Sequence, residues 1–258
     1  MEATTAYTGQ MGVEQSLDDV RFRLARSRAV TVLTGSGISA DSGIPTFRGT
    51  DGLWNTFRAE DLATPEAFAR DPYLVWKWYN WRRELIAGKQ PNAAHDALVE
   101  LERRLESRAG RFHLITQNVD GLHRAAGSRR MTEIHGSIWR VRCTGCGALS
   151  DNREVPIQIP PMCIQCRAML RPDIVWFGEA LAEEDLRTSY EASESCEILL
   201  IIGTSGLVYP AASFAPVAKA AGAYVVELNL EITPSTEVVD CAFQGRAKNL
   251  VPALLEQR

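Results

Sequence analysis

The fold is decided by the stretch Ala29-Val30-Thr31-Val32-Leu33-Thr34-Gly35-Ser36-Gly37-Ile38-Ser39-Ala40. Its first half is a short apolar run rich in β-branched residues, which is typical of a buried strand. Its second half matches the pattern G-x-G-x-x-G/A and begins where that strand ends. Glycines in such a turn let the backbone approach a pyrophosphate, and the following helix offers unpaired N–H groups. The hexamer alone fits an ordinary strand-end turn equally well, so both interpretations stay open here.

Similar apolar runs recur along the chain, at residues 112–116, 197–202 and 223–228. Residues with helical spacing separate them, at 17–28, 93–109 and 211–221. Buried strands that alternate with helices predict an α/β fold, a Rossmann-like parallel sheet with helices on both faces. In such a sheet, ligands bind beyond the carboxyl ends of the strands. These ends carry glycines and polar residues, so we expect the binding site there.

Two stretches interrupt this alternation and predict a smaller lobe. Residues 50–90 are rich in aromatic and charged side chains and predict a helical insert, while residues 138–172 contain four paired cysteines. We therefore expect a discontinuous dinucleotide-binding domain with a small lobe beside it and a flexible N-terminal tail. The domain is assigned to residues 17–49, 91–137 and 173–255, the lobe to 50–90 and 138–172, and the tail to 1–16.

The paired cysteines indicate a zinc ribbon. Cys143-x-x-Cys146 is followed after 16 residues by Cys163-x-x-Cys166. Each C-x-x-C turn can direct two thiolates at one metal, and four thiolates complete a tetrahedron with no open position, so we predict one structural Zn²⁺. Disulfides or four free thiols are the alternatives. Only one arginine and no lysine lie between the two pairs, which is a poor footprint for nucleic acid.

The composition agrees with an enzyme rather than with a nucleic-acid or membrane protein. The 258 residues are 45% hydrophobic and carry a net charge of −4. A chain of this length can bury a large core, and no run approaches the roughly 18 apolar residues that span a bilayer. Met1 to Gln15 has no apolar stretch typical of a signal peptide. We expect a cytoplasmic monomer without nucleic-acid or membrane partners.

Several motifs along the chain occur in a characteristic order. They are Gly35-Ser36-Gly37-Ile38-Ser39-Ala40-Asp41-Ser42-Gly43-Ile44-Pro45-Thr46-Phe47-Arg48, Thr116-Gln117-Asn118-Val119-Asp120-Gly121-Leu122-His123, Glu133-Ile134-His135-Gly136, Val175-Trp176-Phe177-Gly178-Glu179, Gly203-Thr204-Ser205 and Asn229. Together with the paired cysteines, this set resembles the sirtuin family of NAD-dependent protein deacylases. The resemblance runs from about residue 17 to about residue 255.

The resemblance implies that NAD is a co-substrate held across the sheet. It assigns cofactor binding to Gly35, Ser36, Gly37, Ile38, Ala40, Ile44, Phe47, Arg48, Gln117, Asn118, Asp120, Gly203, Thr204, Ser205, Asn229 and Ala247. The pyrophosphate is expected at the Gly35 turn and at Ser205. Asn118 and Asp120, with Ile44, are expected to hold the nicotinamide amide. Ser36 stands where the family usually has alanine.

The resemblance also assigns the catalytic base and the substrate edge. His135 is expected to accept a proton from a ribose hydroxyl, a role that suits a group titrating near neutral pH. Among the competing histidines, His95 lies in a predicted helix and His113 in a predicted strand, and both are interpreted as structural, while His123 is left unassigned. The extended segment Val175, Trp176, Phe177, Gly178 and Glu179, with Val208, is expected to bind the peptide that carries the acylated lysine.

The helical stretch around Tyr79 and Arg82 predicts the acyl group. These two side chains are three residues apart and share a helix face, so a guanidinium and a phenol can bind one carboxylate together. A Tyr-x-x-Arg pair resembles the sirtuin subgroup that removes succinyl, malonyl and glutaryl groups, and Ala59 is expected to make room for them. Two alternatives stay open: an ordinary ion-paired Arg82, or Arg83 as the carboxylate ligand.

Rival functions follow from the same residues. A chain of this type could act mainly as a deacetylase, or could transfer ADP-ribose to a protein. A non-enzymatic NAD-sensing or zinc-ribbon module is a third possibility, against which Gln117, Asn118, Asp120 and His135 argue. A dehydrogenase is disfavoured because Glu60 and Asp61, at the spacing of the usual ribose ligand, do not follow an apolar strand.

Overall fold

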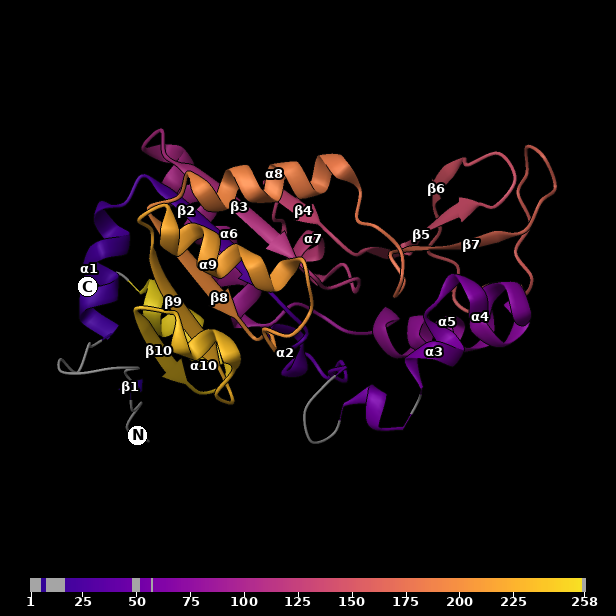
Figure 1. Cartoon of the computed structure of the whole chain (residues 1–258), viewed down its shortest axis with the longest axis horizontal. Coiled ribbons are helices and arrows are strands. Elements are labelled where there is room, and N and C mark those ends of the chain that lie inside the picture. The colour runs from indigo at the N-terminus through magenta and orange to yellow at the C-terminus, as the bar shows by residue number, and fades with distance from the viewer. Residues whose placement is uncertain (1–5, 8–16, 48–51, 57, 257–258) are drawn as a thin grey trace.

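The computed structural model describes residues 6–7, 17–47, 52–56 and 58–256. Within them, the larger lobe is built around a seven-stranded sheet with the order β1-β10-β9-β8-β2-β3-β4 (Figure 1). All strands after β1 run parallel, and β1 pairs antiparallel with β10. The strands are β1 (Ala6–Tyr7), β2 (Ala29–Thr34), β3 (Arg111–Thr116), β4 (Met131–Glu133), β8 (Ile198–Ile202), β9 (Tyr224–Asn229) and β10 (Cys241–Gln244). The Rossmann-like parallel sheet is thereby confirmed.

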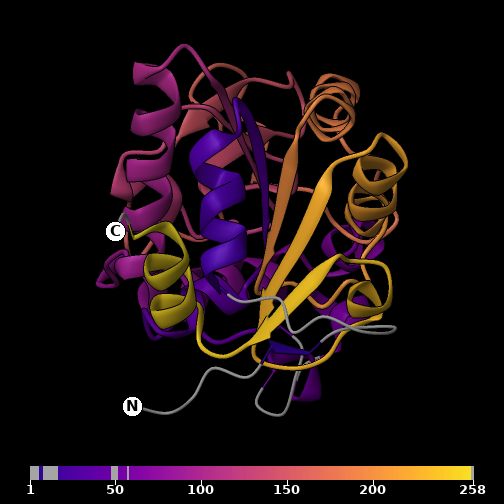
Figure 2. The ribbon, with the colours of Figure 1, turned by 90° about the vertical axis from the view of Figure 1, so that its left-hand side faces the viewer.

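Helices cover both faces of this sheet (Figure 2). One face is covered by α1 (Leu17–Arg26), α6 (Ala93–Ser107) and α10 (Ala247–Leu255), and the other by α8 (Glu183–Glu194) and α9 (Phe214–Ala220). Successive strand residues point to opposite faces, so Val32 packs under the first layer and Leu33 under the second. This is why the central strands are continuously apolar instead of alternating.

The chain reverses its direction of travel across the sheet between β2 and β8. From β2 it proceeds outward to β3 and β4, and from β8 it proceeds to β9 and β10 on the other side. The loops after β2 and β8 therefore diverge and leave a crevice at the carboxyl edge. The apolar runs do not predict β4 or β10, because each contains only three or four residues.

The smaller lobe contains a second sheet and a set of helices. The strands β5 (Gly136–Cys143), β6 (Leu149–Asp151) and β7 (Leu170–Ile174) form an antiparallel sheet with the order β6-β5-β7. Beside it lie α3 (Ala59–Leu62), α4 (Pro65–Arg70) and α5 (Pro72–Ala87). The shorter elements of the chain are α2 (Gly37–Ala40), α7 (Leu122–Ala126), and 3₁₀ turns at Leu53–Asn55, Ala211–Ser213 and Pro234–Glu237.

The starts of α4 and α5 are fixed by local sequence. Thr64 and Asp71 accept hydrogen bonds from backbone N–H groups of the first turns, and a proline follows each of them. Helix α5 then packs its aromatic side chains against β5 and β7, and Trp76 donates its indole N–H to the carbonyl of Leu170 at 2.8 Å. This packing fixes α5 against the smaller sheet.

Most of the N-terminal tail predicted for residues 1–16 lies outside the described residues, apart from the two residues of β1. Within the described part of the chain, no helix combines the length and the apolar character needed to cross a bilayer.

Candidate active site

A cavity of about 1260 Å³ lies at the carboxyl edge of the large sheet, between the two lobes. Most of the residues predicted from the sequence line it. These are Gly35, Ser36, Gly37, Ala40, Ile44, Phe47, Tyr79, Arg82, Gln117, Asn118, His135, Val175, Trp176, Phe177, Gly178, Glu179, Gly203, Thr204, Ser205, Val208, Asn229 and Ala247. Segments that lie far apart in the sequence therefore meet around one space.

Four residues predicted to bind cofactor or substrate are not among those that line this cavity. Ile38 is fully buried in the core beneath the turn, so it supports the turn without facing a ligand. Asp120 lies behind the wall, where it accepts hydrogen bonds from the Ser39 hydroxyl at 2.7 Å and the Leu122 amide at 2.8 Å. Arg48 lies outside the described residues.

The fourth is Ala59, which the structure does not place in the cavity wall as predicted. Ala59 is the first residue of α3, away from the cavity wall. Ala63, which directly follows α3, lines the cavity instead, and its carbonyl accepts the backbone N–H of Phe177 at 2.9 Å. Counting residues back from Tyr79 could not locate this position, because several short helices and turns intervene.

The glycine turn is packed against the loop that follows β8. The Gly37 N–H donates to the carbonyl of Gly203 at 2.8 Å. A Cβ atom at Gly37 would lie 2.7 Å from the Gly203 Cα, and one at Gly35 would lie 2.8 Å from the Thr204 Cα. Both contacts are with backbone and cannot be relieved by rotating a side chain. Gly35 and Gly37 are therefore required for the start of the loop after β2 to pack against the loop after β8.

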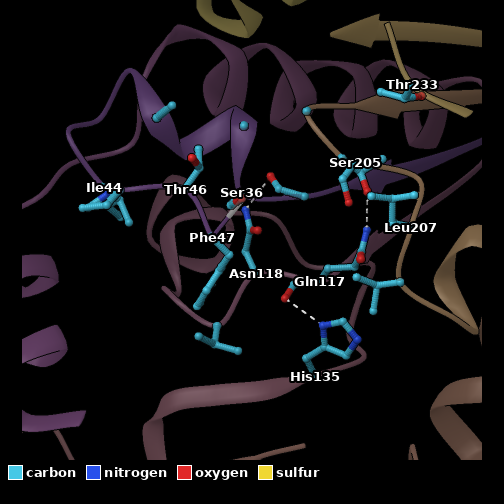
Figure 3. Close-up of a pocket in the computed structure, with 18 of the residues that line it drawn as sticks. Ser36, Ile44, Thr46, Phe47, Gln117, Asn118, His135, Ser205, Leu207 and Thr233 are labelled. Atoms are coloured by element: carbon cyan, nitrogen blue, oxygen red, sulfur yellow. Dashed lines mark hydrogen bonds between the residues drawn. The ribbon is translucent and has the colours of Figure 1, made fainter. Parts of the chain in front are cut away.

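Side-chain amides tie the strand ends together. Asn118 donates to the Gly35 carbonyl at 3.0 Å and to the Ser39 hydroxyl at 3.3 Å. Gln117 donates to the Thr204 hydroxyl at 2.9 Å (Figure 3). Asn229 donates to the Thr204 carbonyl at 2.7 Å. The four loops thus form one hydrogen-bonded floor.

His135 is held at the floor of this cavity in a defined orientation (Figure 3). Its Nδ1 lies 3.1 Å from the carbonyl oxygen of Gln117. A carbonyl only accepts hydrogen bonds, so Nδ1 carries the proton and Nε2 is the nitrogen that can accept one. Burial lowers the pKa of His135, and the bond to Gln117 opposes this only in part. The imidazole is accordingly neutral at neutral pH, as a general base must be.

The other histidines have structural surroundings, as expected for His95 and His113. His95 and His123 are buried with ring centroids 4.8 Å apart, and His113 lies 2.9 Å from the Thr132 hydroxyl. None of them lines the cavity.

At the other end of the cavity, α5 brings Tyr79 and Arg82 together in the wall. Both side chains are at least nine-tenths buried. The guanidinium of Arg82 lies 4.6 Å from the ring centroid of Phe47 and 5.1 Å from that of Trp78. No carboxylate of the described residues lies within 4.0 Å of it. Arg82 is therefore not the ordinary ion-paired arginine that the sequence left open.

Arg83 points in a different direction. Its guanidinium donates to the carbonyl of Ile138 at 2.9 Å and to the Asn152 side chain at 2.6 Å, and it does not line the cavity. Arg83 therefore joins α5 to the smaller sheet, β6-β5-β7. Of these two arginines, Arg82 is the one whose side chain is available to a ligand in the cavity.

The segment Val175–Glu179 lines the cavity mouth, but much of its backbone is already bonded. The amides of Val175, Trp176 and Phe177 donate to His135, Glu179 and Ala63 respectively. A peptide that adds to this edge would accordingly use carbonyl oxygens of the segment in place of these three amides.

Comparisons with known proteins agree on one family. The Sir2 family model matches residues 35–210. The NAD-dependent protein deacylase 2 of Pyrobaculum aerophilum is 51% identical, covering 91% of this chain and 92% of that protein. The NAD-dependent protein deacylase of Aquifex aeolicus is 52% identical over 84% of this chain and 90% of its own length.

Solved structures give the same result. A Sir2 homologue–NAD complex is 42% identical with a TM-score of 0.86, and covers 98% of this chain and 96% of its own. A mutant Sir2 homologue bound to ADP-ribose is 44% identical with a TM-score of 0.88, over 92% of this chain and 94% of its own. The chain belongs to the Sir2 family, the sirtuins.

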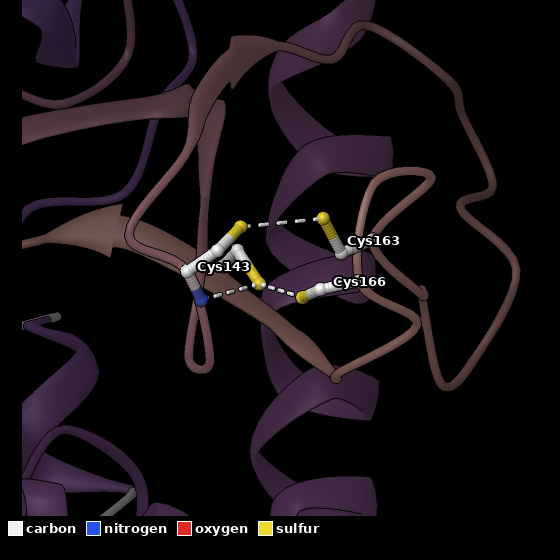
Figure 4. Close-up of side chains that lie close together, drawn as sticks. Cys143, Cys163 and Cys166 are labelled. Carbon is white, nitrogen blue, oxygen red and sulfur yellow. Dashed lines mark hydrogen bonds between the residues drawn. The ribbon is translucent and has the colours of Figure 1, made fainter.

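This sirtuin also contains the predicted four-cysteine cluster, in the small lobe and apart from the cavity. The Sγ atoms of Cys143, Cys146, Cys163 and Cys166 all lie within 4.8 Å of one another (Figure 4). Cys143 and Cys166 are 3.3 Å apart, and Cys146 and Cys163 are 3.8 Å apart. Four thiolates at about 2.3 Å from one Zn²⁺ would be separated by roughly 3.8 Å, so the cluster fits one structural zinc ion. These separations are well beyond the roughly 2.05 Å of an S–S bond, so the four thiols do not form disulfides in this arrangement.

Sequence reasoning missed other residues that line the sirtuin cavity. They include Asp41, Thr46, Ala63, Trp78, Tyr209, Ile232, Thr233 and Arg246. Trp78 lies one helical turn before Arg82 and could have been found from that spacing. The guanidinium of Arg246 forms an ion pair with Asp41 at 2.8 Å. The two residues are 205 positions apart, so no local sequence pattern predicts this contact.

Proposed function

We propose that this sirtuin removes acidic acyl groups from protein lysines in an NAD-dependent reaction, with weaker activity on acetyl-lysine. The acyl groups are succinyl, malonyl and glutaryl, and the products are free lysine, nicotinamide and O-acyl-ADP-ribose. The observation that carries the proposal is the guanidinium of Arg82, which is buried in the cavity wall and has no carboxylate partner among the described residues.

The general activity rests on the family. Relatives that are 51% and 52% identical are named NAD-dependent protein deacylases, and this chain covers at least 90% of each of them. A similar structure is a complex with NAD. The chain is accordingly an NAD-dependent protein deacylase. NAD supplies an electrophilic ribose carbon when nicotinamide leaves, and the glycine turn with Ser205 would hold its pyrophosphate.

His135 provides the base for this chemistry. Its Nδ1–H is held by the Gln117 carbonyl, so Nε2 can accept the proton of a ribose hydroxyl in the cavity. Asn118, fixed between Gly35 and Ser39, would orient the nicotinamide amide together with Ile44. Asp120 contributes by holding Ser39 from behind.

The acyl preference rests on charge. A guanidinium keeps its charge at neutral pH, even though burial lowers the pKa of Arg82. Asp120 attracts this guanidinium only from beyond ion-pair distance, and a buried charge without a directly bonded carboxylate is unfavourable. An acyl carboxylate would supply that bond, and an acetyl group would not. Burial raises the pKa of Tyr79 to about 12, so its phenol stays protonated and can donate a further hydrogen bond.

The test is a panel of one peptide carrying acetyl-, malonyl-, succinyl- or glutaryl-lysine, incubated with NAD and analysed by mass spectrometry. We expect kcat/KM for the succinyl peptide to exceed that for the acetyl peptide on the order of a hundredfold, because hydrogen bonds to charged groups contribute strongly. Equal or lower efficiency on the succinyl peptide would overturn the acyl preference. Protein heavier by one ADP-ribose, without acyl-ADP-ribose, would favour the transferase.

The monomeric state, the cytoplasmic location and the absence of nucleic-acid or membrane partners stay predictions. Light scattering on the purified protein would test the first of these.

A further inference from the structure

A continuous set of contacts joins the peptide-binding segment to the acyl pocket, and it starts outside the cavity. Arg171, on β7, forms a two-pronged ion pair with Glu179, with N–O distances of 2.6 and 2.8 Å. The same carboxylate accepts the backbone N–H of Trp176 at 2.8 Å. The pair therefore closes the turn between Trp176 and Glu179. Arg171 itself does not line the cavity.

Arg171 also fixes the indole ring of Trp176. Its guanidinium lies 3.5 Å from the ring centroid, and its Nη2 donates to the Ile174 carbonyl at 3.0 Å. The ring of Phe68 packs against Trp176 with a centroid distance of 5.3 Å. Only 3% of Trp176 is exposed, so the indole has little freedom to rotate.

The fixed indole in turn reaches the acyl pocket. The Trp176 Nε1–H donates to the Tyr79 hydroxyl oxygen at 2.8 Å. Trp176 approaches as a donor, so the phenol must direct its own proton elsewhere. No other described residue makes a hydrogen bond with this hydroxyl, and Arg82 lies on the same face of α5. The proton of Tyr79 is thus available to a ligand beside Arg82.

We propose that Arg171 and Glu179 are positioning residues for acyl specificity, which hold Trp176 so that its indole directs the Tyr79 hydroxyl proton toward the acyl carboxylate. This inference rests on the proposed function. It assigns specificity to an ion pair on β7 and the adjoining loop, whose acidic member contacts the cavity and whose basic member does not. The simpler alternative is that the pair only braces the peptide segment.

The experiment compares acetyl and succinyl peptides in four proteins: wild type, Trp176→Phe, Tyr79→Phe and the double variant. Trp176→Phe removes the indole N–H and keeps an aromatic ring. We expect it to lower the succinyl-to-acetyl ratio of kcat/KM about five- to tenfold, the usual weight of one hydrogen bond. In the Tyr79→Phe background, the same change should alter the ratio no further, because its target is gone.

Arg171 is tested by a graded pair of variants. Arg171→Met should lower the acyl ratio as Trp176→Phe does, and Arg171→Lys should restore part of it by keeping the charge near Glu179. The matched control is Trp81→Phe, which removes an indole from the same helix at a position outside the cavity. We expect no change in the ratio for that variant, and an unchanged KM for NAD in all of them.

The outcomes separate the two proposals. A wild-type protein without a succinyl preference would overturn the proposed acyl preference itself. A wild-type preference that persists in Trp176→Phe, or that falls equally in both backgrounds, would overturn the positioning role and leave the proposed function standing. If a variant lost activity on both peptides by the same factor, the ion pair would only support the peptide segment, and the proposed role in acyl specificity would be wrong.

Discussion

The nucleotide end and the acyl end of the cavity are built in different ways. The nucleotide end consists of loops at strand ends, where glycines bring backbone against backbone and amide side chains lock the loops. The acyl end consists of side chains from α5, of Ala63 after α3, and of the loop after β7. These residues are far apart in the sequence and come together only in the folded chain. If the proposed function holds, the backbone end serves every acyl substrate and the side-chain end discriminates among them.

The strongest test of this comparison removes the base that both ends share. His135→Ala should lower kcat on acetyl and succinyl peptides alike, by about a thousandfold, because a positioned general base is lost. NAD binding should persist, since His135 makes no contact that shapes the glycine turn. Steady-state kinetics and NAD titration would measure both. His113→Ala is the control, and a variant at His135 that kept full activity would refute its role.

The acyl end can be broken by itself. Arg82→Met keeps a long apolar side chain in the wall but removes the charge, so the succinyl-to-acetyl ratio of kcat/KM should fall about a hundredfold. Arg83→Met is the matched comparison on the next position of the helix. Its guanidinium bonds Ile138 and Asn152, so thermal stability should fall while the acyl ratio stays constant. The opposite pattern would show that Arg83 binds the acyl carboxylate.

The nucleotide end can be broken by adding a single carbon. Gly37→Ala would place a Cβ 2.7 Å from the Gly203 Cα and force the two loops apart. We expect the KM for NAD to rise about tenfold and the free energy of unfolding to fall by about 1–3 kcal/mol. Both peptides should be affected equally. Gly88→Ala is the control, because nothing lies within 4 Å of its Cβ position and its φ is −93°. Equal effects of the two changes would contradict the packing argument.

The same contrast explains how much the sequence could predict. The buried strands are local apolar patterns, and the glycine turn and Asn118 directly follow two of them. Parallel strands bring such carboxyl ends to one edge of the sheet. The zinc ligands also follow from spacing alone. The acyl end depends on how short helices pack, so a count along the chain chose Ala59 where the structure places Ala63. The support of Tyr79 by Trp176 crosses 97 residues and has no local signature.

The pH dependence gives the smallest expected effect and bears on both ends. The reactive form of His135 is the neutral imidazole, and burial holds its pKa below 6.5. Activity should therefore change little between pH 8 and 6.5, and should fall as the pH drops below the lowered pKa, where Nε2 becomes protonated.

The acetyl peptide isolates this effect, because the succinyl carboxylate itself titrates at lower pH. The pH profiles of kcat/KM for both peptides should show the same fall at acid pH from protonation of His135. Only the succinyl profile should fall more steeply at still lower pH, because its carboxylate then loses the charge that Arg82 binds. An acid limb with its midpoint at or above pH 6.5 would contradict the burial of the base, and the enclosed position of His135 beside Gln117 would have to be revised.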